Sequence, residues 1–404
     1  MKEKGEEEQG EYCNSTIILP GEILYEILTY VPFDDLLRRC RWVCREWNGL
    51  TYDSTLRRLH CERTQSVSGY LIEYLTKNTT FHINFVHSIA SSPSSSISLD
   101  FMPEMNIRIR ASTYHAQGLL CCFSELTHRY YVCKPMTQQW TKIPNPTILG
   151  YGEEMAIAVM KSNPLHFKII RFSQCRNDFL LQYCEIFDSK NWAWRVHSEF
   201  ERFPYFIHFD NEGEVLLHGS FHWLTFIDEQ EIIFAFDVYK ENWRLIKVPP
   251  RSQLSSSSSL EEGGDQEKVA EAMNCEVPLE KILVNCKGHL GVLYTPKLPC
   301  MEQCPWIEVW VMEDYLEETS WKKKYRLSLK PLEQIVGWYY ILAVDTMDDS
   351  ITILVRTSDK LIWYNCTTGV LTKVKNLEIP TTTTSIRSIH KFNSDSLPCD
   401  LGPK

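Results

Sequence analysis

The sequence has no long apolar run, no surplus of positive charge and no leader-like start. No stretch approaches the ~18 uninterrupted apolar residues that indicate a transmembrane helix, so we expect none. The formal net charge is -10, which argues against a nonspecific hold on nucleic acid, because phosphates attract Lys and Arg. The acidic first residues contain no apolar core, so neither a signal peptide nor a transit peptide is expected. We therefore expect the chain in the cytoplasm, the nucleus or both.

A disulfide framework is not expected either. The sequence holds 15 cysteines, an odd number, and places several of them in apolar runs such as the one around Cys121 and Cys122. A reducing compartment keeps such thiols free, and a free cysteine packs as a small apolar side chain. We therefore expect buried thiols.

The common catalytic motifs are missing as well. There is no GxxxxGKS phosphate loop, no nucleophile elbow and no double Cys pair at zinc spacing, and Cys300 and Cys304 have no nearby His. The best metal or acid–base candidates are His208, His218 and His222, near Asp210. Packing at a blade edge is the favoured alternative, because His218 and His222 alternate with apolar neighbours. We expect no catalytic residue, no metal and no cofactor.

One compact basic run stands out in this acidic chain. Lys322, Lys323 and Lys324 follow Trp321, and Arg326 comes two residues later. A phosphate contact is one interpretation, but charged runs usually lie on a solvated surface. A solvated strand end is the favoured interpretation.

The first apolar segment predicts short helices. Residues 1–15 are charged and poor in apolar side chains, which predicts a disordered acidic tail. Pro20 suits a first helical position, and Ile23, Leu24, Ile27 and Leu28 recur at the spacing of one helix face. Pro32 ends this helix. Two more short helical patterns follow, over residues 33–40 and 43–50.

From about residue 108 the periodicity becomes that of short strands, with a weak repeat. Each unit is an apolar strand, a polar turn and an aromatic-led strand. The equivalent points Trp140, Trp194, Trp243, Trp321 and Leu371 are separated by 54, 49, 78 and 50 residues. The outlier spans a Ser-, Gly- and Glu-rich insertion at residues 251–280, with a serine run from Ser255 to Ser259. A period near fifty in an all-β region indicates a β-propeller.

We predict an α+β multidomain chain with a six-bladed propeller. The expected closing blade pairs a late strand around residues 385–392 with early strands near residues 107–111. The expected divisions are an acidic tail at 1–15, a three-helix module at 16–60, a connecting region at 61–105, the propeller at 106–395 and a C-terminal tail at 396–404.

The helical module carries more apolar residues than it can bury. Of the 34 residues from 17 to 50, 19 are Ile, Leu, Val, Phe, Tyr, Trp or Cys. A module of about forty residues has too little interior for all of them and usually needs a partner. The surplus could pack on the rest of this chain or on another protein, and the pattern alone does not decide.

The same segment resembles the F-box, a module that docks on a Skp-type adaptor. The resemblance rests on "LPGEILYEILTYVP", "DLLR" and "VCREW", which agree in spacing as well as residue type. Trp47 matches a position of the family and Trp42 does not. Trp47 could pin the third helix or contact the partner. The resemblance implies an adaptor-binding set of Leu19, Pro20, Ile23, Leu24, Ile27, Leu28, Val31, Leu36, Leu37, Val43, Cys44 and Trp47.

The repeat region is similar to the F-box-associated region of plant F-box proteins, a kelch-related propeller. The similarity is carried by "GLLCCFS" at 118–124, "GSFHWL" at 219–224 and "GHLGVLY" at 288–294, each leading into an aromatic-led strand. The chain lacks the paired glycines of kelch repeats, and its long insertion sets it apart from the plant relatives.

Together the two resemblances imply a substrate-recognition subunit of an SCF-type ubiquitin ligase. The F-box would dock on the Skp-type adaptor and so reach the cullin scaffold indirectly, while the propeller would bind a protein substrate. The alternative is a propeller scaffold or receptor that is not coupled to ubiquitin transfer. Aromatic residues at 199–209 could anchor a partner, although strand packing explains most of them more simply. The sequence names no substrate.

Overall fold

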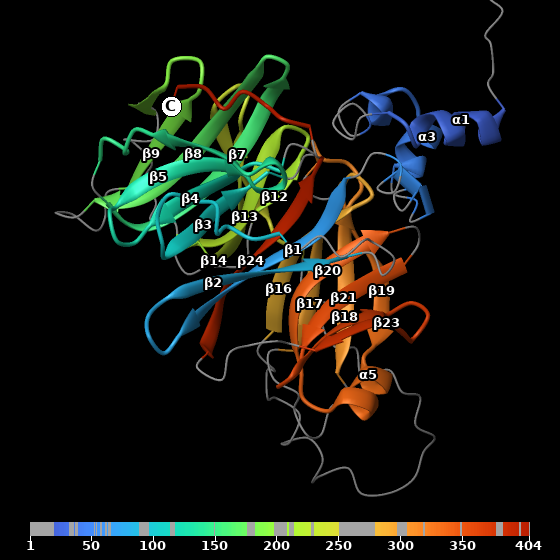
Figure 1. Ribbon diagram of the computed structural model, residues 1–404. Helices are drawn as coiled ribbons and strands as arrows, with labels where there is room; N and C mark the ends of the chain where they lie inside the picture. The colour runs from blue at the N-terminus through green and yellow to red at the C-terminus, as the bar shows by residue number, and fades with distance from the viewer. Residues whose placement is uncertain are drawn as a thin grey trace, which may run out of the picture.

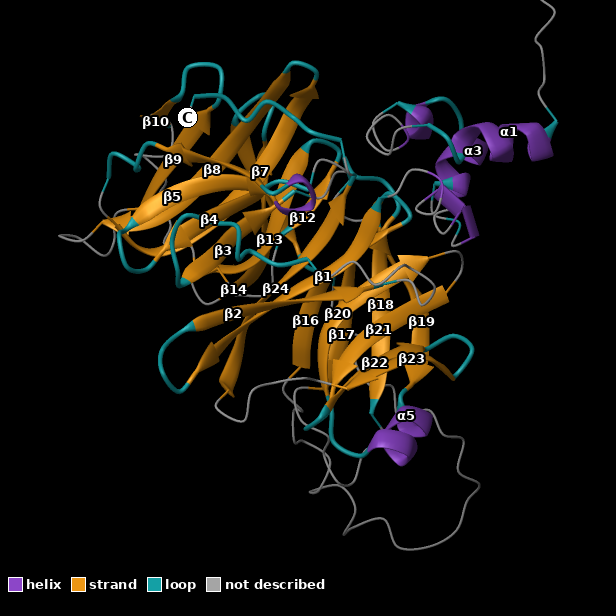
Figure 2. Ribbon diagram, viewed as in Figure 1, coloured by secondary structure: helices purple, strands orange, loops and turns teal. Residues whose placement is uncertain are grey.

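Six antiparallel sheets form a ring in the computed structural model (Figures 1 and 2). The structure describes residues 20–31, 36, 39–51, 53, 55–56, 59–60, 63, 66–88, 97–113, 118–148, 150–175, 182–197, 208–209, 214–227, 230–249, 279–296, 305–317, 320–347, 350–376, 383–395 and 397–403. Within them the architecture is a six-bladed β-propeller preceded by a small helical module, as the sequence predicts.

Five blades are built from consecutive strands. Blade 1 contains β3 (Ile107–Ser112), β4 (Leu120–Ser124), β5 (Arg129–Lys134) and β6 (Gln139–Ile143), and blade 2 contains β7 (Gly150–Ser162), β8 (Leu165–Cys175), β9 (Gln182–Asp188) and β10 (Ala193–Val196). Blade 3 contains β11 (His208–Phe209), β12 (Val215–Leu217), β13 (Ser220–Ile227), β14 (Gln230–Asp237) and β15 (Asn242–Lys247). Blade 4 contains β16 (Leu279–Cys286), β17 (His289–Pro296), β18 (Trp306–Met312) and β19 (Trp321–Ser328), and blade 5 contains β20 (Tyr340–Met347), β21 (Ser350–Arg356), β22 (Lys360–Asn365) and β23 (Val370–Asn376).

The helices lie outside the ring. The helical module contains α1 (Gly21–Leu28), the 3-10 turn η1 (Cys40–Trp42) and α3 (Arg45–Leu50). A second 3-10 turn, η2 (Pro135–Thr137), joins two strands of blade 1, and α5 (Lys330–Val336) joins blades 4 and 5. Figure 1 shows α5 at the opposite end of the propeller from the module. In the described part of the chain, no helix has the length and apolar character needed to span a membrane.

The five equivalent points of the sequence repeat all lie on outermost strands, so the predicted repeat is confirmed. They are Trp140 on β6, Trp194 on β10, Trp243 on β15, Trp321 on β19 and Leu371 on β23. Two of these indoles join neighbouring blades. Trp194 Nε1–H donates to the carbonyl of Pro144 at 2.7 Å, and Trp321 Nε1–H donates to the carbonyl of Lys247 at 3.0 Å. A buried indole N–H needs such an acceptor, which fixes how one blade meets the next.

Apolar packing between the blades closes the ring. Six clusters of buried side chains each join two neighbouring blades, and together they run once around the propeller. Aromatic packing between blades 2 and 3 is an example, where Phe172 meets Trp223, Phe234 and Phe236 with ring centroids 5.5–5.9 Å apart. Every blade therefore buries both of its faces.

The closing blade differs from the one predicted. The late strand β24 (Thr383–Ser394) forms as expected, but it pairs with β1 (Val67–Thr76), and β1 pairs in turn with β2 (Phe81–His87). The predicted partner near residues 107–111 is wrong because that segment, β3, is the first strand of blade 1. Residues 61–105, expected as a connecting region, thus contain two propeller strands. Almost every residue of β1 is buried, so its sequence shows no strand-like alternation.

A buried carboxylate joins the closing blade to blade 1. Glu73 of β1 accepts a hydrogen bond from Ile109 N–H at 2.9 Å through Oε1. Its Oε2 accepts from Arg108 Nε at 3.5 Å and from Ser388 Oγ at 3.3 Å. Burial raises the pKa of Glu73, and these donors oppose that shift. One side chain therefore links β1, β3 and β24.

The C-terminal segment is attached along blade 1. Lys134 is buried, pairs with Asp395 and donates to the carbonyl of Leu397 at 2.6 Å. Gln139 Nε2–H donates to the carbonyl of Cys399 at 2.8 Å, and its Oε1 accepts from Cys399 N–H at 3.1 Å. Leu401 inserts into the cluster between blades 1 and 2. The expected C-terminal tail is part of the folded propeller over residues 397–403.

Removal of the Glu73 carboxylate should destabilise the ring closure. We expect Glu73→Ala to lower the free energy of unfolding by about 2–4 kcal/mol, because Ile109 N–H and Arg108 lose a buried acceptor. Glu73→Gln retains one oxygen acceptor at the same place and should cost less than half as much. Urea unfolding followed by tryptophan fluorescence measures both values, and equal losses in the two variants would contradict this role.

Candidate adaptor-binding module and the two faces of the propeller

Pro20 immediately precedes the first helix of the module. The Pro20 carbonyl accepts hydrogen bonds from the N–H groups of Ile23 and Leu24, both at 3.0 Å. At the other end Thr29 is buried, and its hydroxyl donates to the carbonyl of Glu26 at 2.7 Å. A proline before the first turn loses no hydrogen bond, because that turn has no partners for its N–H groups.

Helix α1 has two apolar faces. Leu24 and Leu28 are buried and point into the module. Ile23 and Ile27 lie on the neighbouring face and are 50% and 42% exposed. Tyr30 is also exposed, three residues after Ile27. The helix thus offers an outward apolar face that its own module leaves uncovered.

The interior of the module is small. Leu36, Cys40 and Leu56 are buried with Leu24 and Leu28. Trp47 is partly buried against this cluster, which is the internal position considered in the sequence analysis. Val43 and Cys44 are exposed.

Polar contacts hold the residues after α3 against α1. Asp53 Oδ1 accepts from Tyr25 Oη at 3.1 Å and from Leu56 N–H at 2.6 Å. His60 Nε2–H donates to the carbonyl of Val31 at 2.7 Å.

Arg63 adds a further link to the same helix. Its guanidinium pairs with Glu26 at 2.8 Å and stacks over the Tyr30 ring at 4.6 Å from the centroid. The folded module therefore extends at least to Arg63, slightly beyond the expected limit at residue 60.

The twelve predicted adaptor-binding residues thus separate by position. Leu24, Leu28 and Leu36 are buried inside the module, while Val31 and Trp47 are partly buried against them. The exposed members are Pro20, Ile23, Ile27, Val43 and Cys44. Leu19 and Leu37 lie outside the described residues, as does most of the predicted helix over residues 33–40. Sequence reasoning missed Tyr30, although its spacing from Ile23 and Ile27 is that of one helix face.

Trp42, which does not match a position of the F-box family, contacts the propeller. Its indole is 71% exposed and lies 6.1 Å from the His218 ring of blade 3, between ring centroids. His218 in turn contacts Tyr315 of blade 4 at 4.9 Å. The module therefore touches the propeller at the turn between β12 and β13.

Within the predicted histidine cluster, His222 is a packing residue between blades 3 and 4. His222 is buried, and its Nδ1–H donates to the carbonyl of Val215 at 3.1 Å. Its Nε2 then accepts from Tyr315 Oη at 2.6 Å. Burial lowers the pKa of His222 to about 4. Both ring nitrogens of His222 are therefore hydrogen-bonded. Asp210 lies outside the described residues. Among the residues that the structure describes, no group of three His, Cys, Asp or Glu side chains could hold a metal ion.

The basic run on β19 is paired with carboxylates. Lys322 and Lys324 contact Glu313 at 2.5 and 2.7 Å, and Lys323 contacts Glu308 at 3.5 Å. The two lysines lower the pKa of Glu313 to about 2. The run is a solvated strand with local counter-charges, which was the favoured interpretation.

The described cysteines are free thiols, as expected. Cys121, Cys122, Cys133 and Cys184 are buried in the blades. Cys122 and Cys133 face each other with 3.8 Å between their Sγ atoms, and this contact and burial raise the pKa of Cys122. Cys300 and Cys304 lie outside the described residues.

Two glutamates inside the propeller have raised pKa values. Burial raises the pKa of Glu154 to about 7, against the opposing charge of Arg110. Burial and the neighbouring Glu154 raise the pKa of Glu214 to about 8. Two carboxylates that share one interior region favour the neutral state of at least one.

The two faces of the propeller differ in their connections. The face nearer the helical module contains tight turns such as those at residues 163–164, 218–219 and 287–288. The strand ends on either side of four longer connections lie on the face that carries α5. These connections are residues 176–181, 198–207, 250–278 and 297–304. The expected partner-binding aromatics at 199–209 and the insertion at 251–280 fall almost wholly outside the described residues.

Exposed aromatic residues gather beside α5. Trp338 and Tyr340 are largely exposed, and so is Ile335 on the helix itself. Tyr340 also lines a small pocket of about 40 Å³ together with Tyr339, Pro305 and Glu280. Exposed large apolar side chains in one place are typical of protein-binding surfaces.

A short helical module with an outward apolar face, followed by a six-bladed propeller, is the architecture of an F-box protein of the propeller type. Comparison with family profiles agrees. Residues 17–63 match the profile described as F-box-like, and residues 70–376 match the F-box associated beta propeller domain. The chain belongs to the F-box associated beta propeller family. Neither description names a catalytic activity.

Two curated relatives of this chain are plant proteins. F-box protein At5g49610 of Arabidopsis thaliana is 23% identical over 398 residues, which cover 95% of this chain and 98% of the relative. F-box protein At5g41720 of the same plant is 33% identical over 163 residues, covering 38% of this chain and 86% of the relative. A chain in the crystal structure of a nidogen/laminin complex aligns with 82% of this chain at 11% identity and a TM-score of 0.44.

The raised pKa values of Glu154 and Glu214 predict a pH-dependent stability. The folded protein retains protons that the unfolded chain releases near pH 4.5, so stability is complete below that pH and is lost as pH rises through about 7 and 8. Between pH 6.5 and 8 we expect the free energy of unfolding to fall by roughly 1 kcal/mol per pH unit. The opposite contribution of His222, with its pKa near 4, lies below this window.

Urea unfolding at a series of pH values measures this slope. Glu214→Gln should reduce the slope, because the amide does not titrate, and the double variant Glu154→Gln with Glu214→Gln should remove it. Glu317→Gln, at an exposed position, is the control and should leave the slope unchanged. A slope in Glu214→Gln equal to that of the unchanged protein would contradict the assignment.

Proposed function

We propose that the chain is a substrate-recognition subunit of an SCF-type ubiquitin ligase. In this proposal the helical module docks on a Skp-type adaptor, which connects it to a cullin scaffold, and the propeller binds the protein to be ubiquitinated. The chain contributes proximity rather than chemistry, because holding a substrate near a charged ubiquitin carrier raises its effective concentration. Such a subunit would work in the cytoplasm, the nucleus or both.

The observation that carries the proposal is the uncovered apolar face of the module. Pro20, Ile23, Ile27 and Tyr30 lie along one side of the segment that contains α1, and none of them is buried by the propeller. Val43 and Cys44 add exposed apolar surface near η1. A stable protein–protein interface buries about 1,200–2,000 Å² of surface in total. The exposed side chains of this face would supply part of that area. The match of residues 17–63 to the F-box-like family supports the identity of the partner.

A propeller scaffold uncoupled from ubiquitin transfer is the second candidate. The contact between Trp42 and His218 favours it, because a module that packs on its own propeller would need no adaptor. The contact involves an indole that stays 71% exposed, and it leaves Ile23 and Ile27 uncovered. The first proposal therefore has the stronger support.

Charge on the exposed face should abolish adaptor capture. We expect the double variant Ile23→Glu and Ile27→Glu to lose at least about tenfold in affinity for a Skp-type adaptor, because two charges would be buried in an apolar interface. Both positions are exposed in the free protein, so folding should be retained. Pull-down with purified adaptor and calorimetry give the affinity, and circular dichroism reports folding.

Ile335→Glu is the control, since Ile335 is also exposed but lies on α5 at the far end of the propeller. It should bind the adaptor normally. Adaptor binding that survives in the double variant would contradict the proposed interface. A wild-type protein that captures no Skp-type adaptor would favour the scaffold.

A further inference from the structure

The closing blade has an open edge. The other described blades have four or more strands, whereas the closing blade has the order β2-β1-β24, and β2 pairs only with β1. The fourth position, which β6, β10, β15, β19 and β23 fill in the other blades, is not filled by a strand of the described residues. An edge strand presents main-chain groups that can pair with another chain.

The register shows which main-chain groups of β2 face outward. Hydrogen bonds join Ser88 N–H to the Ser68 carbonyl at 3.0 Å and Thr76 N–H to the Thr80 carbonyl at 2.9 Å. In an antiparallel pair such bonded positions alternate with unbonded ones. The even-numbered residues of β2 therefore face β1, and Phe81, Ile83, Phe85 and His87 direct their N–H and C=O groups away from the sheet.

Side chains from elsewhere bind some of these outward groups. Asn106 Oδ1 accepts from Phe81 N–H at 2.8 Å. Lys373 and Lys375, both on β23 of blade 5, donate to the carbonyls of His87 at 3.0 Å and of Phe85 at 3.4 Å. The structure shows no such partner for Ile83 among the described residues. The middle of the edge is thus unpaired, with two ammonium groups beside it.

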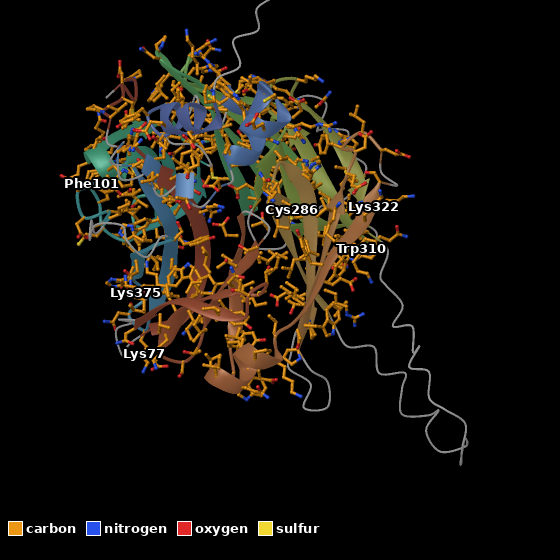
Figure 3. All side chains as sticks on the ribbon, turned by 90° about the vertical axis from the view of Figure 1, so that its right-hand side faces the viewer. Lys77, Phe101, Cys286, Trp310, Lys322 and Lys375 are labelled. Carbon is orange, nitrogen blue, oxygen red and sulfur yellow. The ribbon has the colours of Figure 1, made fainter. Side chains whose placement is uncertain are left out.

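Lys373 and Lys375, together with Lys77, form a basic strip beside β2 in a protein of net negative charge. Lys77 lies in the turn between β1 and β2, and Figure 3 shows it on the same side of the molecule as Lys375, away from Lys322. Burial and the neighbouring Lys375 lower the pKa of Lys373. Lys375 has no carboxylate partner within the described residues. Acidic groups brought to this edge would relieve the repulsion between the two ammonium groups.

We propose that the β2 edge binds an extended, acidic segment of a partner protein, which adds the fourth strand of the closing blade. The incoming strand donates its own N–H groups to the carbonyls of Phe85 and His87. Lys373 and Lys375 are thereby released to pair with acidic side chains of that strand. Main-chain hydrogen bonds supply the affinity, and the lysines supply the preference for acidic sequences.

The proposal names the class of segment that the propeller recognises and so deepens the proposed function, on which it rests. Binding at β2 does not require the Skp-type adaptor. A failure at this edge and a failure of adaptor capture are therefore measured separately.

The probe is a short acetylated and amidated peptide in which Glu alternates with Val and Thr. We expect it to bind the full chain about tenfold or more tightly than the same peptide with Lys in place of Glu. A version N-methylated at every residue should not bind, because it has no main-chain N–H group to donate. Fluorescence anisotropy gives the affinities, and hydrogen exchange of the amides in residues 81–87 locates the site.

Two pairs of variants test the geometry. Ile83→Pro removes an outward N–H, so it should keep the fold and lose the peptide, whereas Asn84→Pro removes an N–H that faces β1 and should destabilise the blade. The double variant Lys373→Glu and Lys375→Glu should prefer the lysine peptide. Its control is the double variant Lys322→Glu with Lys324→Glu, which should retain the preference for the acidic peptide. Both double lysine variants should still capture the adaptor.

The proposal is overturned if the acidic peptide does not slow exchange at Ile83 and Phe85. It is also overturned if those amides are already protected in the free protein. Protection that is independent of concentration would mean that a segment of this chain covers the edge, and protection that grows with concentration would mean that a second copy does.

Discussion

The structure depends on the pairing of β1 with β24. Each blade buries both faces against its neighbours, so the ring has no stable end: opening it at one place exposes two apolar faces at once. Residues more than three hundred positions apart meet in this pairing, and the entropy of joining them is offset by a long antiparallel ladder and by the apolar clusters on both sides. Glu73 adds a buried acceptor at the same junction, where it holds three strands of two blades together.

The helical module and the propeller use their surfaces in different ways. The module has a small interior and leaves Ile23 and Ile27 of its first helix exposed. The propeller buries the faces of its blades against one another, and its interior also holds ionisable groups. His222 is hydrogen-bonded at both ring nitrogens, while burial and the neighbouring Glu154 raise the pKa of Glu214. The two faces of the propeller are unlike as well, with tight turns near the module and the flanks of the longer connections near α5.

Much of this organisation could be predicted from the sequence, for identifiable reasons. The equivalent positions on the outermost strands recur because each blade repeats one strand pattern, and Trp194 and Trp321 also repeat one contact with the preceding blade. The partner of β24 was not visible, because β1 is buried on both faces and shows no alternation. Within the module, Ile23 and Ile27 have the same spacing as Leu24 and Leu28, so the sequence predicted an apolar helix but not which face turns inward. Nor could it show that Trp42 reaches His218, since that contact depends on where two separate units meet.

The position of β24 along the chain also has a consequence for biosynthesis. Every strand of the other five blades leaves the ribosome before this one, as does the helical module. Until β24 emerges, β1 lacks its ladder partner, and the apolar faces next to the closing blade remain open to solvent and to other nascent chains. The helical module can therefore form while the ring is still unfinished, and the closing blade is the last blade of the propeller to be completed.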